Sequence, residues 1–105
     1  MIHNKLVRDR IPEIIEKGGK TPVTRTLDAD EYRAELRRKL TEETNEYLES
    51  GELEELADIL TVLRALCRAD GHAIAELEAA FDRKLEARGG FEERIYLIRT
   101  EDGQA

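Results

Sequence analysis

The chain has 105 residues, of which 40% are apolar and 39% are charged, and its formal net charge is −7. This length is typical of one domain with one core, so we expect a single domain over residues 1–105 rather than two independent ones. The negative charge repels nucleic-acid phosphates and anionic membranes, which argues against either of them as the main partner.

The N-terminal part of the chain predicts a short helix over residues 10–16. Pro12 falls in its first turn, where proline is tolerated, and Gly18-Gly19 provides a stop. Residues 22–26 and 94–100 alternate in polarity and contain the Val, Thr, Ile and Tyr that are typical of strands. These two stretches could therefore form a small two-stranded β-ribbon.

A long helix is predicted from Asp28 to about residue 49. Asp28 precedes Glu31 by three residues, which is the spacing of a capping box at a helix start. The apolar and aromatic positions form one stripe of an amphipathic helix: Tyr32, Leu36, Leu40 and Tyr47. Glu43 falls on this same stripe.

Two further long helices are expected, over residues 52–70 and 72–88. Ser50-Gly51 breaks the first pattern, and Gly89-Gly90 ends the last helix. The helix over 52–70 is apolar on nearly every side, so we expect it at the centre of the fold. The predicted fold class is all-α, an antiparallel helical bundle with a short N-terminal helix.

The central helix presents two apolar faces. One runs through Leu56, Leu60, Leu63 and Cys67, and the other through Ile59, Val62 and Leu66. A single chain has too few partner helices for both faces, and an exposed apolar patch of that size is rare in monomers. We therefore expect a homodimer or a dimer of dimers, in which the face with Val62 is buried against another subunit.

Several features of the sequence indicate where the protein is located and how its cysteine, histidines and tail are placed. The charged start lacks the apolar stretch of a signal peptide, and no apolar run is long enough for a membrane span, so we expect a cytoplasmic protein. Cys67 is the only cysteine and is expected to be a small buried thiol. His3 and His72 are expected at the surface or in caps. A flexible tail is expected after about Thr100.

Four carboxylates occur as two pairs with i, i+3 spacing. Glu43 and Glu46 lie on the first long helix, and Glu55 and Asp58 lie on the next. Each pair points to one patch of its helix, and the short connection makes the helices antiparallel neighbours, so the two pairs should face each other. Four like charges at a helix interface are costly, and a divalent cation removes that cost. All-oxygen ligands favour Mg²⁺, with Mn²⁺ as an alternative.

The competing interpretation is that these glutamates are an ordinary solvated face of an acidic protein. Two details favour the metal site. Glu43 lies on the apolar stripe, and Asp58 lies within an apolar run, where an unpaired charge would cost several kcal/mol. The nearest basic residue after Asp58 is Arg64, six positions later and on another face.

The pattern EExxE at residues 42–46, followed by ExxD at 55–58, resembles the signature of the all-α nucleoside triphosphate pyrophosphohydrolase superfamily, the MazG-like proteins. Residues 4–15, NKLVRDRIPEII, and 84–92, KLEARGGFE, resemble the two ends of a house-cleaning subgroup that is often described as phosphoribosyl-ATP pyrophosphohydrolase-like. The resemblance covers about residues 3–98.

This resemblance implies a substrate, a cofactor and a set of site residues. Mg²⁺ would be bound by Glu43, Glu46, Glu55 and Asp58, with Glu42 supporting the site or orienting water. A nucleoside triphosphate would be hydrolysed between its α and β phosphates to a monophosphate and pyrophosphate, with no covalent nucleophile from the protein. By similarity to the family's basic residues, Lys84 and Arg88 would bind the phosphates. Lys5 and Arg8 are weaker candidates, and Arg8 or Asp9 could instead make a structural ion pair.

Other functions remain open on the sequence alone. The chain could be a non-catalytic helical dimerisation or adaptor module whose carboxylates are only surface charge. Phosphoribosyl-ATP hydrolysis in histidine synthesis would use the same chemistry on another substrate. No aromatic pair or amide cluster marks a base pocket. Phe91 could stack on a base or could pack in the core.

Overall fold

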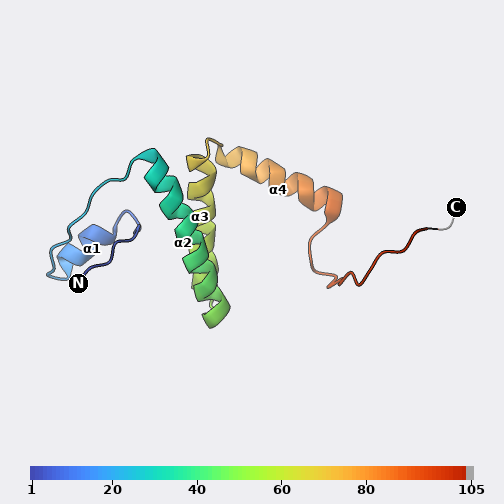
Figure 1. The fold of residues 1–105 in the computed structure, drawn as a ribbon, viewed down its shortest axis with the longest axis horizontal. Helices are drawn as coiled ribbons and strands as arrows, with labels where there is room; N and C mark the ends of the chain where they lie inside the picture. The colour runs from blue at the N-terminus through green and yellow to red at the C-terminus, as the bar shows by residue number, and fades with distance from the viewer. Residues whose placement is uncertain (104–105) are drawn as a thin grey trace. The chain divides into compact units, whose positions relative to one another are not determined.

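The computed structural model describes residues 1–103 and has four helices, labelled α1 to α4 in Figure 1. They are α1 (Ile11–Lys17), α2 (Ala29–Ser50), α3 (Leu53–Ala69) and α4 (Ile74–Arg88). The all-α class and all four predicted helices are therefore confirmed, with ends within two residues of those expected. The chain divides into two compact units, Met1–Ile74 and Ala75–Ala105.

Local sequence fixes both ends of α2. The Asp28 side chain accepts a hydrogen bond from the Glu31 backbone N–H at 2.9 Å, and Glu31 Oε1 accepts one from the Asp28 N–H at 3.4 Å. This is the predicted capping box. At the other end Gly51 adopts the left-handed conformation, with φ 67°, and its N–H donates to the Tyr47 carbonyl at 2.8 Å. The helix therefore stops where glycine permits the reversal.

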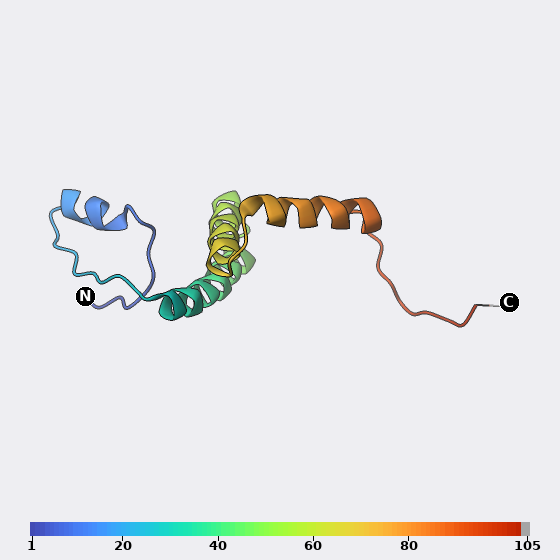
Figure 2. The same ribbon diagram turned by 90° about the horizontal axis from the view of Figure 1, so that it is seen from above.

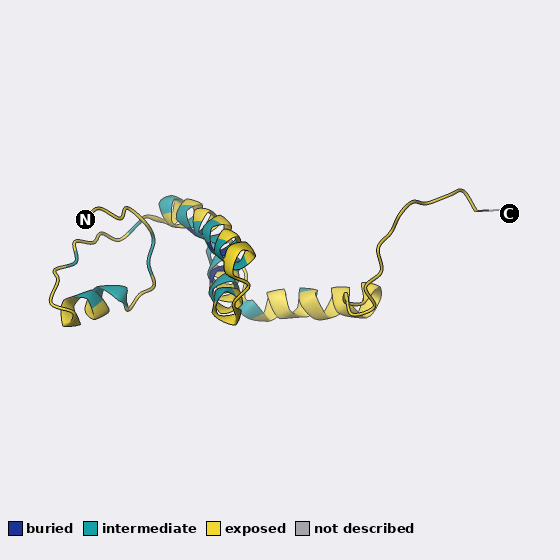
Figure 3. Ribbon diagram, turned by 90° about the horizontal axis from the view of Figure 1, so that it is seen from below, coloured by how far each residue is buried: buried dark blue, intermediate teal, exposed yellow. Residues whose placement is uncertain are grey.

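Helices α2 and α3 pack against each other as an antiparallel hairpin, and Figure 2 shows the pair from a second direction. Arg33, near the start of α2, donates to the Ala69 carbonyl at 3.3 Å and pairs with Asp70 at 3.5 Å, both at the end of α3. Leu36 and Val62 are 4% and 7% exposed and are the buried apolar residues of the described chain. Figure 3 shows buried residues, in dark blue, on α2 and α3.

The structure corrects the prediction about the two faces of α3. Val62, assigned above to the same face as Ile59 and Leu66, is buried within this chain. The opposite face is the exposed one, because Leu56, Leu60 and Leu63 are between 41% and 50% exposed. Helical periodicity gave the two faces but not which of them packs on α2, since both are apolar.

The predicted β-ribbon is wrong: residues 1–103 contain no strand. Residues 22–26 and 94–100 run without regular structure, although their composition suits a strand. Strand preference is realised only when the backbone pairs with a neighbouring strand, and neither segment pairs in this way. None of the described helices is both long enough and apolar enough to span a membrane.

In the second unit, α4 ends at Arg88, and the next residue, Gly89, closes the helix with a φ of 76°. The apolar side chains of α4 are largely exposed, with Leu77, Phe81 and Leu85 at 41%, 62% and 46%. The chain then continues without regular structure to residue 103. The tail predicted to be flexible includes residues 104 and 105, which lie outside the described residues.

Candidate metal centre

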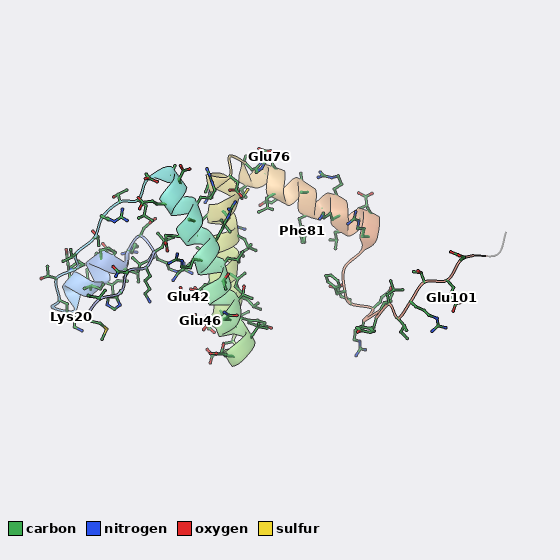
Figure 4. The ribbon with its side chains drawn as sticks, viewed as in Figure 1. Lys20, Glu42, Glu46, Glu76, Phe81 and Glu101 are labelled. Atoms are coloured by element: carbon green, nitrogen blue, oxygen red, sulfur yellow. The ribbon has the colours of Figure 1, made fainter. Side chains whose placement is uncertain are left out.

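The α2–α3 hairpin brings the predicted carboxylates together in two groups that share Glu43. One oxygen from each of Glu42, Glu43 and Glu46 lies within 4.8 Å of the others, and the same holds for Glu43, Glu55 and Asp58. The first group lies along α2, where Glu42 and Glu46 are one turn apart (Figure 4). The second group crosses from α2 to α3. The structure thus places all five predicted acidic residues in one cluster.

Glu43 is the buried member of this cluster. It is 7% exposed, and its Oε2 atom is buried with no hydrogen-bond partner in the described residues. Burial raises the pKa of Glu43, and the neighbouring Glu46 carboxylate raises it further; Asp58 acts in the same direction and Lys39 opposes it. Orphaned buried oxygens are rare in folded proteins and call for an explanation. A bound cation would supply the missing partner.

Lys39 is a cation of this site that the sequence reasoning missed. Its ammonium lies 3.5 Å from Glu42 Oε1 and 3.5 Å from Glu43 Oε1, and its side chain is only 18% exposed. Lys39 precedes these glutamates by three and four residues, which places it on the same helix face. The spacing alone could therefore have indicated it.

Asp58 has a cationic partner, contrary to the expectation from its sequence neighbours. Arg8, from the segment before α1, donates from Nη2 to Asp58 Oδ1 at 2.5 Å and to Thr61 Oγ1 at 3.4 Å. The Asp58 side chain is 35% exposed, so it is not a deeply buried charge. Arg8 therefore makes an ion pair, as one of the sequence-based alternatives had it, over a separation of 50 residues.

The donor set fits a hard divalent cation. Oxygens about 2.0–2.1 Å from Mg²⁺ lie at most about 4.2 Å apart, so groups already within 4.8 Å of one another need only small side-chain adjustments. The ligands are all carboxylate oxygens, which suit Mg²⁺ or Mn²⁺ rather than zinc. Glu43 belongs to both groups, which makes it the central ligand of any such site.

The remaining basic candidates are exposed side chains. Lys5 is exposed in the N-terminal segment, and Lys84 and Arg88 are exposed one turn apart at the end of α4 in the second unit. Residues 88–95 of that unit line a hollow of about 330 Å³, whose wall includes Arg88 and Phe91. The Phe91 side chain is 95% exposed, so it does not pack in a core of the second unit.

The potential nucleophiles of the chain are Cys67 and the two histidines. Cys67 is half-buried rather than fully buried, and its Sγ donates to the backbone carbonyls of His72 and Ala73 at 3.8 and 3.5 Å. His3 and His72 are exposed, as expected. Cys67 therefore sits where α3 ends and the chain turns toward α4, away from the acidic residues near the start of α3.

Comparisons with known proteins give one partial relative. A protein of Mycolicibacterium smegmatis (strain ATCC 700084 / mc(2)155), described as uncharacterized, is 62% identical over 42 residues. The match covers 40% of this chain and 43% of that protein, so the chain spans less than half the length of the relative. No protein-family model matches the chain, and no solved structure does. These comparisons assign neither a family nor an activity.

Proposed function

We propose that the chain is a Mg²⁺-dependent nucleoside triphosphate pyrophosphohydrolase of the MazG-like type. The observation that carries this proposal is the buried, unpartnered Glu43 oxygen at the centre of two carboxylate groups. An ordinary cluster of surface charges would leave every carboxylate oxygen exposed, whereas Glu43 is only 7% exposed and its Oε2 atom is buried. The EExxE and ExxD patterns and the resemblance at both ends of the chain support the same function.

In this proposal each acidic side chain has a defined role. Glu43, Glu46, Glu55 and Asp58 hold the cation, and the two helices fix their positions. When bound, Mg²⁺ supplies charge neutralisation for the triphosphate and lowers the pKa of water. Glu42, held by Lys39, orients the water and accepts its proton. Manganese could replace magnesium in the same ligand set.

The basic side chains bind the charge that the metal leaves uncompensated. Lys84 and Arg88 are one turn apart on α4 and form a pair of donors for phosphate oxygens. Lys5 and Arg8 are further donors from the N-terminal segment. Hydrolysis adds the elements of water across the α–β phosphoanhydride bond, and the products are a nucleoside monophosphate and pyrophosphate. The substrate class is a nucleoside triphosphate, with removal of non-canonical nucleotides as the role that the resemblance implies.

We propose that the active form is a homodimer or a dimer of dimers. Its support is the exposed face of α3, where three leucines in successive turns lie open to solvent. Burying such a face stabilises a complex by about 25 cal/mol per Å² of apolar area. A second copy of the chain offers an identical face, which is the usual way in which such surfaces are covered.

The test is a screen of canonical and damaged nucleoside triphosphates with the purified chain and Mg²⁺, with products separated by ion-exchange chromatography. We expect a monophosphate and pyrophosphate in equal amounts, and no turnover without a divalent cation. A diphosphate and orthophosphate would contradict cleavage between the α and β phosphates. If no triphosphate is cleaved and Mg²⁺ leaves the melting temperature unchanged, the chain is the adaptor module instead, because only binding to the folded state stabilises it. Activity restricted to phosphoribosyl-ATP would assign the enzyme to histidine synthesis.

A further inference from the structure

Arg8 makes a shorter ion pair with the carboxylate cluster than Lys39 does, and it comes from a distant part of the sequence. It lies in the segment before α1 and contacts two residues one turn apart on α3, Asp58 at 2.5 Å and Thr61 at 3.4 Å. The Thr61 hydroxyl in turn donates to the Ala57 carbonyl at 3.0 Å. The guanidinium therefore lies at the edge of the group formed by Glu43, Glu55 and Asp58.

In this position the positive charge of Arg8 would repel a bound cation. A guanidinium that pairs with Asp58 Oδ1 would be only a few ångströms from a divalent ion held by the same group, and like charges at that distance repel strongly. The Arg8 side chain is 54% exposed, so it can return to water easily. Partly exposed ion pairs of this kind are weak. The ion pair is thus the element of the site that a cation can displace most readily.

We propose that Arg8 is a displaceable counterion of the metal centre. Without a divalent cation it neutralises Asp58 and holds the N-terminal segment on α3. When the cation binds, Asp58 becomes its ligand and the guanidinium is released, so that it can bind a phosphate oxygen. The inference rests on the proposed function, and it adds that binding of the metal and binding of the phosphates are coupled through one side chain.

A different role for the same contact predicts the opposite effect. A carboxylate has two oxygens, and Asp58 could keep Arg8 on one of them while the other binds the metal. Arg8 would then orient the ligand, and loss of such supporting hydrogen bonds lowers metal affinity. Displacement instead predicts that removing Arg8 raises the affinity. The sign of the change therefore separates the two roles.

The experiment measures Mn²⁺ binding to the full chain without nucleotide, by electron paramagnetic resonance of free Mn²⁺. Wild type is compared with Arg8→Ala, with the charge-retaining Arg8→Lys, and with Arg10→Ala as the matched control. Arg10 lies in the same segment but pairs with Glu13 at 2.6 Å. We expect Arg8→Ala to bind Mn²⁺ about 2- to 5-fold more tightly, the equivalent of one partly exposed ion pair. Arg8→Lys should lie near wild type, and Arg10→Ala should equal it.

Two negative results of the Mn²⁺ binding experiment would refute different parts of the proposal. If wild type binds Mn²⁺ and Arg8→Ala binds it equally or more weakly, the displacement is refuted while the metal centre stands. If no protein binds Mn²⁺ at millimolar concentration, the metal centre is wrong and the displacement falls with it. In the wild type, the Arg8 Nε–H resonance should shift on titration with diamagnetic Mg²⁺. An unchanged resonance in a protein that binds Mg²⁺ would also refute the release, and this measurement requires no variant to fold.

Discussion

The Glu43→Gln variant should be more stable than wild type without Mg²⁺ and less stable than wild type with Mg²⁺. Without a cation, the ionised form of Glu43 is a buried charge beside the Glu46 carboxylate, and a poorly compensated buried group costs about 1–3 kcal/mol, a penalty that the neutral amide of glutamine reduces. The substitution also weakens the contact with Lys39, an ion pair worth at most about 1 kcal/mol, and Lys39 keeps its contact with Glu42. The net expectation is a gain of about 1 kcal/mol, which is about 4–8 °C in melting temperature for a chain of this size.

With Mg²⁺ the order should invert. At a concentration 100 times its dissociation constant, a ligand stabilises the folded state by about 2.7 kcal/mol. Wild type should gain this amount, whereas Glu43→Gln should gain much less because its central ligand is neutral. The assay is thermal unfolding of both proteins with and without Mg²⁺, with Glu49→Gln as a control at an exposed position of α2. A variant that is less stable without Mg²⁺, or that Mg²⁺ stabilises as much as wild type, would refute the reasoning.

The same substitution has a defined pH dependence without Mg²⁺. The pKa of Glu43 is raised in the folded protein, chiefly by burial. Above the ordinary value of 4.5 the folded state therefore binds more protons than the unfolded state, and stability falls as the pH rises through that window. The advantage of Glu43→Gln should accordingly grow from acid to neutral pH. An advantage that is constant with pH would show that charge is not its cause.

Four further outcomes follow from the site and the fold. Asp58→Asn should lower kcat by at least about 100-fold in steady-state kinetics, because a metal ligand positions the reaction. The stability of this variant without metal, measured by thermal unfolding, should differ from that of wild type by no more than about 1 kcal/mol. Leu60→Lys should turn the oligomer into a folded monomer in sedimentation velocity, and a wild type that is already a monomer at micromolar concentration would exclude the interface. Arg25, and then the backbone N–H at the start of α2, lower the pKa of Glu31 to about 2, so its contribution to stability is present above pH 4.5 and is lost as the pH falls toward 2; the difference in melting temperature between wild type and Glu31→Gln should shrink over that range. Arg88→Ala should reduce kcat/KM about 10- to 1,000-fold by a similar factor for every triphosphate, and a base-dependent loss would contradict phosphate binding.

Features encoded in adjacent residues could be predicted from the sequence. The capping box of Asp28 and Glu31 and the stop at Gly51 depend on neighbours within a few positions. The burial of Glu43 follows from helical periodicity, because it shares a stripe with Leu36. The pairing of the two carboxylate motifs follows from a turn too short for any arrangement other than an antiparallel hairpin.

Features that depend on tertiary contacts could not be predicted in this way. Arg8 and Asp58 are 50 residues apart, and no periodicity links a segment without regular structure to a helix. The orientation of α3 was ambiguous because apolar residues occur on two of its faces, and only the packing on α2 shows that Val62 lies inside. The strand-like composition of residues 22–26 was misleading because a strand also needs a partner.

The position of a bound cation in a crystal of this protein grown with Mn²⁺ would test the proposed metal centre itself. Anomalous scattering locates manganese independently of the protein density. We expect an anomalous peak between α2 and α3, at coordination distance from Glu43 and from at least one of Glu55 and Asp58. A manganese site at full occupancy elsewhere, or no anomalous peak at the Glu43 carboxylate, would contradict the metal centre and therefore the proposed hydrolase activity.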